Sequence, residues 1–204
     1  MGLIKGRIHE AILTTVNRDG SYNPAPMGVT RAGPETLELR PFKSSATYGN
    51  LKRNQRACVN VTDDPGLFLT TAFKEADLHS FRPPTIDDEM RLKDAEAHIF
   101  IRTSKSQDIS EDRASFICLV EGIEAEYMRP KIFSRGKAEA IEAVIHATRI
   151  EVFSKEGKLG EVERLIRLSA ECKDVIERVS KPGSVEVRVI RELERMIASW
   201  RDAG

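Results

Sequence analysis

The sequence lacks several features that would assign it to a special class of protein. None of its apolar runs approaches the ~20 residues that a membrane-spanning helix needs, and its N-terminal segment has no apolar core of the kind found in signal peptides. Its 32 basic residues are balanced by 32 acidic ones, so the whole chain lacks the positive charge of an electrostatic nucleic-acid binder. We therefore expect a cytoplasmic protein that binds neither a membrane nor a nucleic acid.

Cysteine is also scarce. The three cysteines, Cys58, Cys118 and Cys172, are odd in number, far apart and without a C-x-x-C pair. This spacing argues against a disulfide framework and a zinc cluster, and it favours buried, inert thiols in a reducing compartment. The acidic run Asp87–Glu89 indicates the start of a helix better than a metal site. We expect no bound metal.

Short β-branched and aromatic runs occupy the first part of the chain and alternate with turn signals such as residues 17–21. The expected strands cover residues 11–16, 23–30, 36–40, 57–61, 97–103 and 114–125, and short helices are expected over 45–54 and 67–73. We expect the two prolines of the second segment to prevent it from forming a regular central strand. Strands this short with such turns predict a closed or nearly closed antiparallel barrel.

The pattern becomes helical near residue 133. Apolar residues then recur at spacings of three and four, which predicts helices over 138–148, 159–179 and 184–200. We therefore divide the chain into a barrel domain at residues 1–133 and a helical subdomain at 134–204 that packs on the barrel. The predicted class is mainly β with α.

Two segments carry functional information. The first is Asn23–Gly28, where two prolines remove main-chain donors and a glycine removes a side chain. Such a backbone leaves carbonyls and amides free for a flat ligand, although an edge strand with a bulge explains it equally well.

The second segment is Arg40–Thr47, which has two cations and three hydroxyls just before a predicted helix. Unpaired amides at a helix N-terminus bind phosphate, and Arg, Lys, Ser and Thr assist them. Residues 31–56 contain six basic and two acidic residues. The alternative is that Ser44 or Ser45 merely caps the helix. Together the two segments suit a ligand with a flat ring at one end and a phosphate at the other.

Three stretches, ILTTVNRDGSYNPAPMGV, RPFKSSATYGNLKRN and CVNVTDDP, resemble in order and spacing the flavin-binding split-barrel superfamily. The resemblance covers roughly residues 8–65 and is strongest to a mostly archaeal family of unassigned function with a helical C-terminal extension. It implies an antiparallel split β-barrel and a homodimer that holds FMN in a cleft at the subunit interface.

The resemblance also implies site residues. Ring contacts would come largely from main chain, and the phosphate contacts from the segment before and within the short helix. The implied cofactor-binding residues are Pro26, Met27, Gly28, Val29, Arg40, Lys43, Ser44, Ser45, Thr47 and Asn50. Two hydroxyls stand where relatives often have an acidic residue, which leaves open which hydroxyl meets the phosphate. Asn50 and Asn60 have the alternative role of holding the loop, and Thr14 and Thr15 that of pairing strands.

The reaction is less defined than the cofactor. No acid, base or nucleophile stands at a diagnostic spacing, and no G-x-G-x-x-G motif provides a nicotinamide site, so NAD(P)H would bind only transiently. We expect an FMN-dependent oxidoreductase of the flavin-reductase kind or an electron-transfer protein. The alternatives are a flavin-binding sensor without turnover and an assembly protein whose basic segment binds another phosphorylated ligand.

Overall fold

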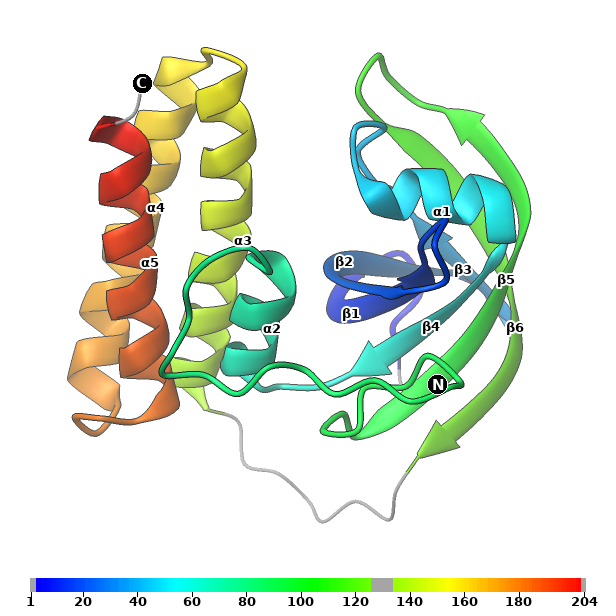
Figure 1. Cartoon of the computed structure of the whole chain (residues 1–204), viewed down its shortest axis with the longest axis horizontal. Coiled ribbons are helices and arrows are strands. Elements are labelled where there is room, and N and C mark those ends of the chain that lie inside the picture. The colour runs from blue at the N-terminus through cyan, green and yellow to red at the C-terminus, as the bar shows by residue number, and fades with distance from the viewer. Residues whose placement is uncertain (1–2, 126–133, 203–204) are drawn as a thin grey trace. The chain divides into compact units, whose positions relative to one another are not determined.

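The computed structural model describes residues 3–125 and 134–202, and for residues 201 and 202 it describes the backbone alone. These described residues form six strands and five helices in two compact units (Figure 1). The first unit takes residues 3–62 and 84–125, and the second takes 63–83 and 134–202. The predicted boundary at residue 133 lies outside the described residues. That the helices pack on the barrel stays a prediction.

The first unit is a closed antiparallel barrel, which confirms the predicted fold. Its strands are β1 (Ile8–Val16), β2 (Tyr22–Gly33), β3 (Thr36–Leu39), β4 (Arg56–Val61), β5 (Ala97–Asp108) and β6 (Ala114–Ala125). They pair in the order β1-β2-β3-β6-β5-β4, and β4 closes the barrel by pairing with β1.

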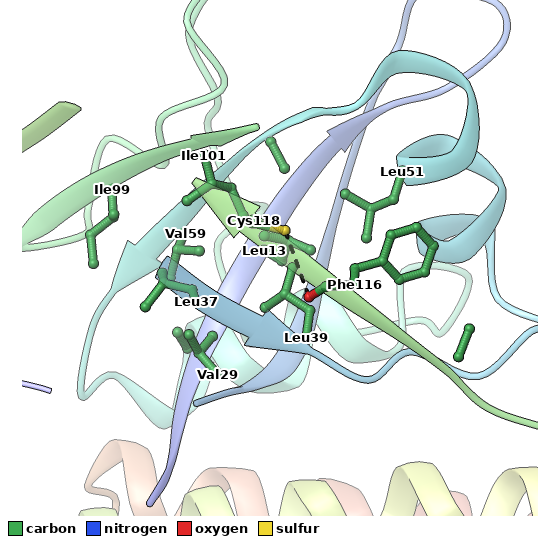
Figure 2. Packing of buried hydrophobic residues seen from close by; sticks show 13 residues of the cluster. Leu13, Val29, Leu37, Leu39, Leu51, Val59, Ile99, Ile101, Phe116 and Cys118 are labelled. Atoms are coloured by element: carbon green, nitrogen blue, oxygen red, sulfur yellow. Dashed lines mark hydrogen bonds between the residues drawn. The ribbon is translucent and has the colours of Figure 1, made fainter. Parts of the chain in front are cut away.

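Alternating side chains fill the barrel interior. Leu13, Leu39 and Phe116 are fully buried in this cluster (Figure 2). Helix α1 (Ala46–Asn54) contributes Leu51 to the same cluster and packs Tyr48 edge-on against Phe116, with ring centroids 5.8 Å apart. Because burial of one such leucine stabilises by about 1.5–3 kcal/mol, α1 is fixed to the barrel by its apolar face.

The prolines of β2 do not interrupt the strand. β2 pairs in continuous register with β1, where Pro24 lies opposite Thr14 and Pro26 opposite Ile12. Because the prolines are two residues apart, both have the same orientation in the strand. Proline is tolerated at positions whose N–H would point away from the partner strand and so would not take part in its hydrogen bonds. β3 joins the other edge of β2 only from Val29 onward. β2 is thus regular along β1, but among the described residues no strand covers its other edge over residues 22–28, so this stretch is not a regular central strand, as expected.

The second unit consists of helices. These are α2 (Pro65–Ala72), α3 (Arg135–Lys155), α4 (Leu159–Val179) and α5 (Val185–Asp202). α4 buries Val162, Leu165, Ser169, Cys172 and Ile176, the predicted spacing of three and four. α2 contacts α3 and α5 (Figure 1), and Phe73 packs against Trp200 at 5.6 Å. The division at residue 133 placed α2 with the barrel, whereas the structure groups it with the C-terminal helices. The physical reason is that α2 buries nearly all of its residues and needs neighbours on every side.

The cysteines are buried and unpaired, as predicted. Burial raises the pKa of Cys58 to about 12 and that of Cys118 to about 11, so both stay protonated at neutral pH. Within the described ranges, no helix is both long and apolar enough to span a membrane.

Candidate functional site

The open edge of β2 is the first part of the candidate site. Residues 22–28 pair with β1 alone in the described chain. Val29 is 1% exposed and belongs to the barrel interior, and Met27 packs against the same cluster. Val29 can therefore offer a ligand only its main chain, whereas Met27 remains partly exposed. Gly28 faces outward, where an added Cβ would lie 3.0 Å from Cγ2 of Ile8.

The start of α1 is the second part. Ser45 is its N-cap: the hydroxyl accepts a hydrogen bond from the amide of Tyr48 at 3.2 Å and donates one to the carbonyl of Phe42 at 2.7 Å. Ser45 is thus the capping residue foreseen in the alternative interpretation. Helix geometry gives the amides of Ala46 and Thr47 no intrahelical acceptor, and no acidic residue stands in the first turn.

The other two hydroxyls of this segment differ. Ser44 is exposed, and in the described part of the chain its hydroxyl makes no hydrogen bond. Thr47 is only 3% exposed. Ser44 is therefore a hydroxyl that an arriving anion can meet at the surface without breaking a protein contact.

A hydrogen bond joins the two parts of the site. The side-chain amide of Asn23, at the start of the open edge, donates to the hydroxyl of Thr47 at 3.2 Å. The same amide donates to the hydroxyl of Thr15 on β1 at 3.3 Å. The first turn of α1 is thereby held beside the first residues of the open edge, which brings together segments about 20 residues apart in the chain.

Asn50 belongs to the scaffold of this junction. It is buried, and its amide donates to Thr15 at 3.0 Å and to Asn17 at 2.9 Å. Its carbonyl oxygen accepts a hydrogen bond from Arg53 at 2.8 Å. With both donors and the acceptor in use, Asn50 suits the role of holding the loop better than that of touching a ligand.

The two predicted cations are held in ion pairs. Arg40 forms a two-point contact with Glu38 at 2.9 and 3.0 Å, and Ser115 donates to the same carboxylate at 2.6 Å. The Arg40 guanidinium lowers the pKa of Glu38, and the carboxylate raises the pKa of Arg40. Lys43 contacts Asp108 at 2.9 Å, and that carboxylate is 63% exposed. Lys43 is thus the cation that an anion can recruit more easily.

The end of the β5–β6 hairpin contacts residues 40–43 before α1. The sequence analysis did not predict these contacts. The amide of Lys43 donates to the carbonyl of Asp112 at 2.8 Å. The guanidinium of Arg113 stacks over the ring of Phe42 at 3.7 Å and donates to the carbonyl of Arg40 at 3.0 Å. Nothing in the sequence indicates these contacts, because the partners are about 70 residues apart.

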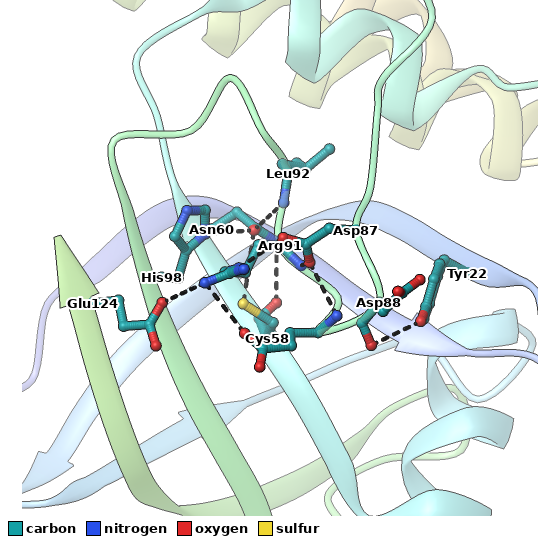
Figure 3. Close-up of polar contacts among 10 residues, drawn as sticks. Tyr22, Cys58, Asn60, Asp87, Asp88, Arg91, Leu92, His98 and Glu124 are labelled. Atoms are coloured by element: carbon teal, nitrogen blue, oxygen red, sulfur yellow. Dashed lines mark hydrogen bonds and ion pairs between the residues drawn. The ribbon is translucent and has the colours of Figure 1, made fainter. Parts of the chain in front are cut away.

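A second polar network surrounds Asn60 on β4 (Figure 3). Its amide donates to the carbonyl of Ile12 at 3.0 Å and to Thr14 at 2.9 Å, and its carbonyl oxygen accepts from the amide of Leu92 at 2.8 Å. His98 lies 3.1 Å from the same oxygen. Asn60 therefore ties β1, β4 and the segment before β5 together, and Thr14 has the strand-pairing role.

The segment before β5 differs from the expected helix start at Asp87–Glu89. Asp87–Glu89 does not start a helix; it forms the tip of a hairpin in which Ile86 pairs with Leu92. The carboxylate of Asp87 accepts the amides of Glu89 and Arg91, both at 3.0 Å, which closes the turn. Aspartate favours such turns as well as helix starts, so the residue types alone mislead. Tyr22 donates its hydroxyl to the carbonyl of Asp88 at 3.0 Å, which places this hairpin beside the start of β2.

Neither metal nor histidine chemistry is evident at the site. No group of His, Cys, Asp and Glu side chains in the described residues is arranged to hold a metal ion. His79 belongs to the helical unit, where its side chain is 87% exposed and contacts Asp77 at 2.6 Å.

Three solved structures are similar to this chain, and the first of them shares its fold. An FMN-bound protein from Methanosarcina mazei is 22% identical, with a TM-score of 0.73 over 95% of this chain and 96% of that one. The styrene monooxygenase flavin reductase of Pseudomonas putida S12 is 17% identical, covering 59% of this chain and 81% of that one with a TM-score of 0.49. A flavoredoxin from Methanosarcina acetivorans is 15% identical, covering 64% and 75% with a TM-score of 0.48.

The first of these matches spans both the barrel and the helices, and that protein is described as a member of the DUF447 family. The N-terminal domain model of the family described as protein of unknown function DUF447 matches residues 9–127. This is more than half of the chain, and the chain therefore belongs to the DUF447 family.

Proposed function

We propose that the protein binds FMN, with the ring against the open edge of β2 and the phosphate at the start of α1. The observation that carries the proposal is the hydrogen bond from Asn23 to Thr47, because it holds a main-chain edge beside a helix N-terminus. The FMN bound to the similar protein from Methanosarcina mazei supports it. The helix start also fits a phosphate chemically, since its first turn has two amides to donate and no acidic side chain.

The residues of the start of α1 have distinct parts in this proposal. Ser44 and the amides of Ala46 and Thr47 donate to the phosphate, and Lys43 leaves Asp108 to add a positive charge. Each hydrogen bond to a charged oxygen contributes about 1.5–3 kcal/mol. Arg40 contributes less than Lys43, because its two-point contact with Glu38 would have to break first.

FMN, when bound, supplies the redox chemistry, and the chain supplies position and charge. The pKa of Glu38 is lowered and that of Arg40 is raised, so both groups are held in their charged forms. Such groups stabilise charge and do not exchange protons near neutral pH. The reaction proposed is hydride or electron transfer, which the flavin would supply, as in an oxidoreductase or electron carrier, with transiently bound NAD(P)H as a donor.

A homodimer with the cofactor at the subunit interface belongs to the same proposal. Ile8 is 70% exposed, and Leu119 and Ile123 are 47% and 48% exposed on the barrel. Apolar side chains of this kind suit a surface that a second copy covers. The unpaired thiols support a cytoplasmic location.

Fluorescence titration of the apoprotein with FMN tests the proposal. Lys43→Met should weaken FMN binding about tenfold, in line with the loss of one hydrogen bond to a charged group. Lys173→Met is the matched control, because Lys173 also forms an exposed ion pair, with Glu194 at 2.6 Å, but in the helical unit. A wild-type protein that binds no FMN, or equal losses in the two variants, would contradict the proposed site.

A further inference from the structure

Three hydroxyls near Asn23 differ in what their protons do. They belong to Thr15, Thr47 and Ser45, and each accepts a hydrogen bond from an amide. The hydroxyl of Thr15 accepts from the amides of Asn23 and Asn50 and donates to the carbonyl of Asn23 at 3.4 Å. The hydroxyl of Ser45 accepts from one neighbour and donates to another. Both hydroxyls thus use their proton within the protein.

Thr47 differs from both. Its hydroxyl accepts from Asn23 at 3.2 Å, and among the contacts of the described residues its proton has no acceptor. The side chain is 97% buried, given its exposed fraction of 3%. A buried hydroxyl proton without a partner costs free energy that a ligand acceptor can recover. Because the Thr47 oxygen accepts from the amide of Asn23, its proton remains available to donate to a ligand.

We infer that Asn23, acting through Thr47, makes the site specific for phosphorylated over unphosphorylated flavin, an inference that rests on the proposed FMN site. A phosphate offers acceptor oxygens and negative charge, which match a hydroxyl that can only donate. The terminal hydroxyl of riboflavin can also accept a hydrogen bond, but it is uncharged and therefore a weaker acceptor. Asn23 is thus a positioning residue, and Thr47 is the group that touches the ligand.

The backbone supports this role for Asn23. The residue is 6% exposed and precedes Pro24, which restricts it to an extended conformation. Its amide also bonds to Thr15 of the neighbouring strand. The side chain therefore cannot turn away from Thr47 without breaking a second buried hydrogen bond.

The test compares dissociation constants for FMN and for riboflavin, measured by flavin fluorescence on the full-length apoprotein. Asn23→Asp replaces the donor by an acceptor that takes the proton of Thr47, and Thr47→Val removes the hydroxyl at nearly constant volume. Asn54→Asp is the matched control: Asn54 lies on the same helix and donates to the carbonyl of Val16, away from Thr47. Thr47→Ser retains the hydroxyl. Thermal unfolding of each variant confirms that it is folded.

In the wild type, FMN should bind more tightly than riboflavin. Asn23→Asp and Thr47→Val should each reduce this preference by about tenfold or more, the size of a hydrogen bond to a charged group, through the FMN constant alone. Asn54→Asp and Thr47→Ser should keep the preference.

Two outcomes would overturn the inference while FMN binding stands: an unchanged preference in Asn23→Asp, or equal losses for both ligands, which would mean a scaffold role. If Asn23→Asp does not fold, retention of the preference in Thr47→Val overturns the inference. A wild type that binds neither flavin would overturn the proposed function itself.

Discussion

Single asparagine side chains connect the strands of this barrel to its loops. Asn60 is fully buried, and its three best contacts reach the carbonyl of Ile12, the hydroxyl of Thr14 and the amide of Leu92. A side-chain amide can satisfy both donors and acceptors at once, so one residue connects three segments of the chain. Loss of such a residue leaves several buried groups without partners, and their desolvation makes the loss costly.

Asn60→Leu should therefore lower the free energy of unfolding by about 3 kcal/mol, since at least two buried polar groups lose their partner. Asn54→Leu is the matched control, because Asn54 makes one exposed hydrogen bond, to Val16. That change should cost less than about 1 kcal/mol. Urea unfolding followed by circular dichroism measures both values. Similar losses in the two variants would show that Asn60 does not hold the strands together.

At the N-terminus of helix α1, two neighbouring serines have different roles. Ser45 caps the helix from within the chain, whereas the hydroxyl of Ser44 points to no partner in the described residues. Ser45 thus stabilises the helix, and Ser44 is available to bind a ligand. The same substitution at both positions can test these two roles.

Ser45→Ala should destabilise the protein by about 1 kcal/mol, the usual cost of a lost N-cap. Ser44→Ala should change stability by less than about 0.5 kcal/mol, as an exposed substitution does, and should weaken FMN binding instead. Chemical unfolding and FMN titration of both variants give the comparison. If Ser44→Ala destabilised the protein as much as Ser45→Ala, or left FMN affinity unchanged, the assigned roles would be wrong.

Helix α3 contains a buried histidine with consequences for pH. His146 is 6% exposed, its Nδ1 has no partner among the described residues, and Nε2 lies 3.6 Å from Glu142. Burial lowers its pKa from 6.5, an effect that outweighs the opposing charge of Glu142. The folded state therefore binds fewer protons than the unfolded state near this pH, and stability falls as the pH drops below the unfolded value.

The urea midpoint of the wild type should accordingly decrease between pH 7.5 and pH 5.5, around the ordinary histidine value. His146→Leu cannot bind a proton and should show a smaller decrease. Hydrogen exchange of peptides from α3 and α4 locates the effect in the helical unit. A wild type and variant with the same pH response would exclude His146 as the cause.

For the molecule as a whole, the chain enters the helical unit twice. Residues 63–83 leave the barrel sequence, form α2 among the C-terminal helices and return before β5. α2 is apolar over most of its length, and its contacts are with α3 and α5. A cut at residue 133 would therefore separate α2 from the helices that bury it.

Trypsin should cleave a fragment of residues 1–133 rapidly within 63–83, after Lys74, whereas the full chain should resist cleavage there. Mass spectrometry of the early products identifies the sites. Equal resistance of this segment in fragment and full chain would show that α2 is stable without α3 and α5.

Much of this architecture could be predicted from the sequence, because it depends on local patterns. The β-prone run at residues 11–16 and the helical spacing along 159–179 identify elements that the structure confirms. The contact of Asn23 with Thr47 could not be predicted, since it depends on where α1 lies against β2. The hairpin at Asp87 was missed because its acidic residues also suit a helix start.

Binding of FMN can be tested with the visible absorption spectrum of the purified, untagged protein. We expect flavin bands at ~450 nm and release on heating of about one FMN per chain, identified by chromatography and mass spectrometry. A colourless protein that also fails to bind added FMN would show that this fold does not hold FMN.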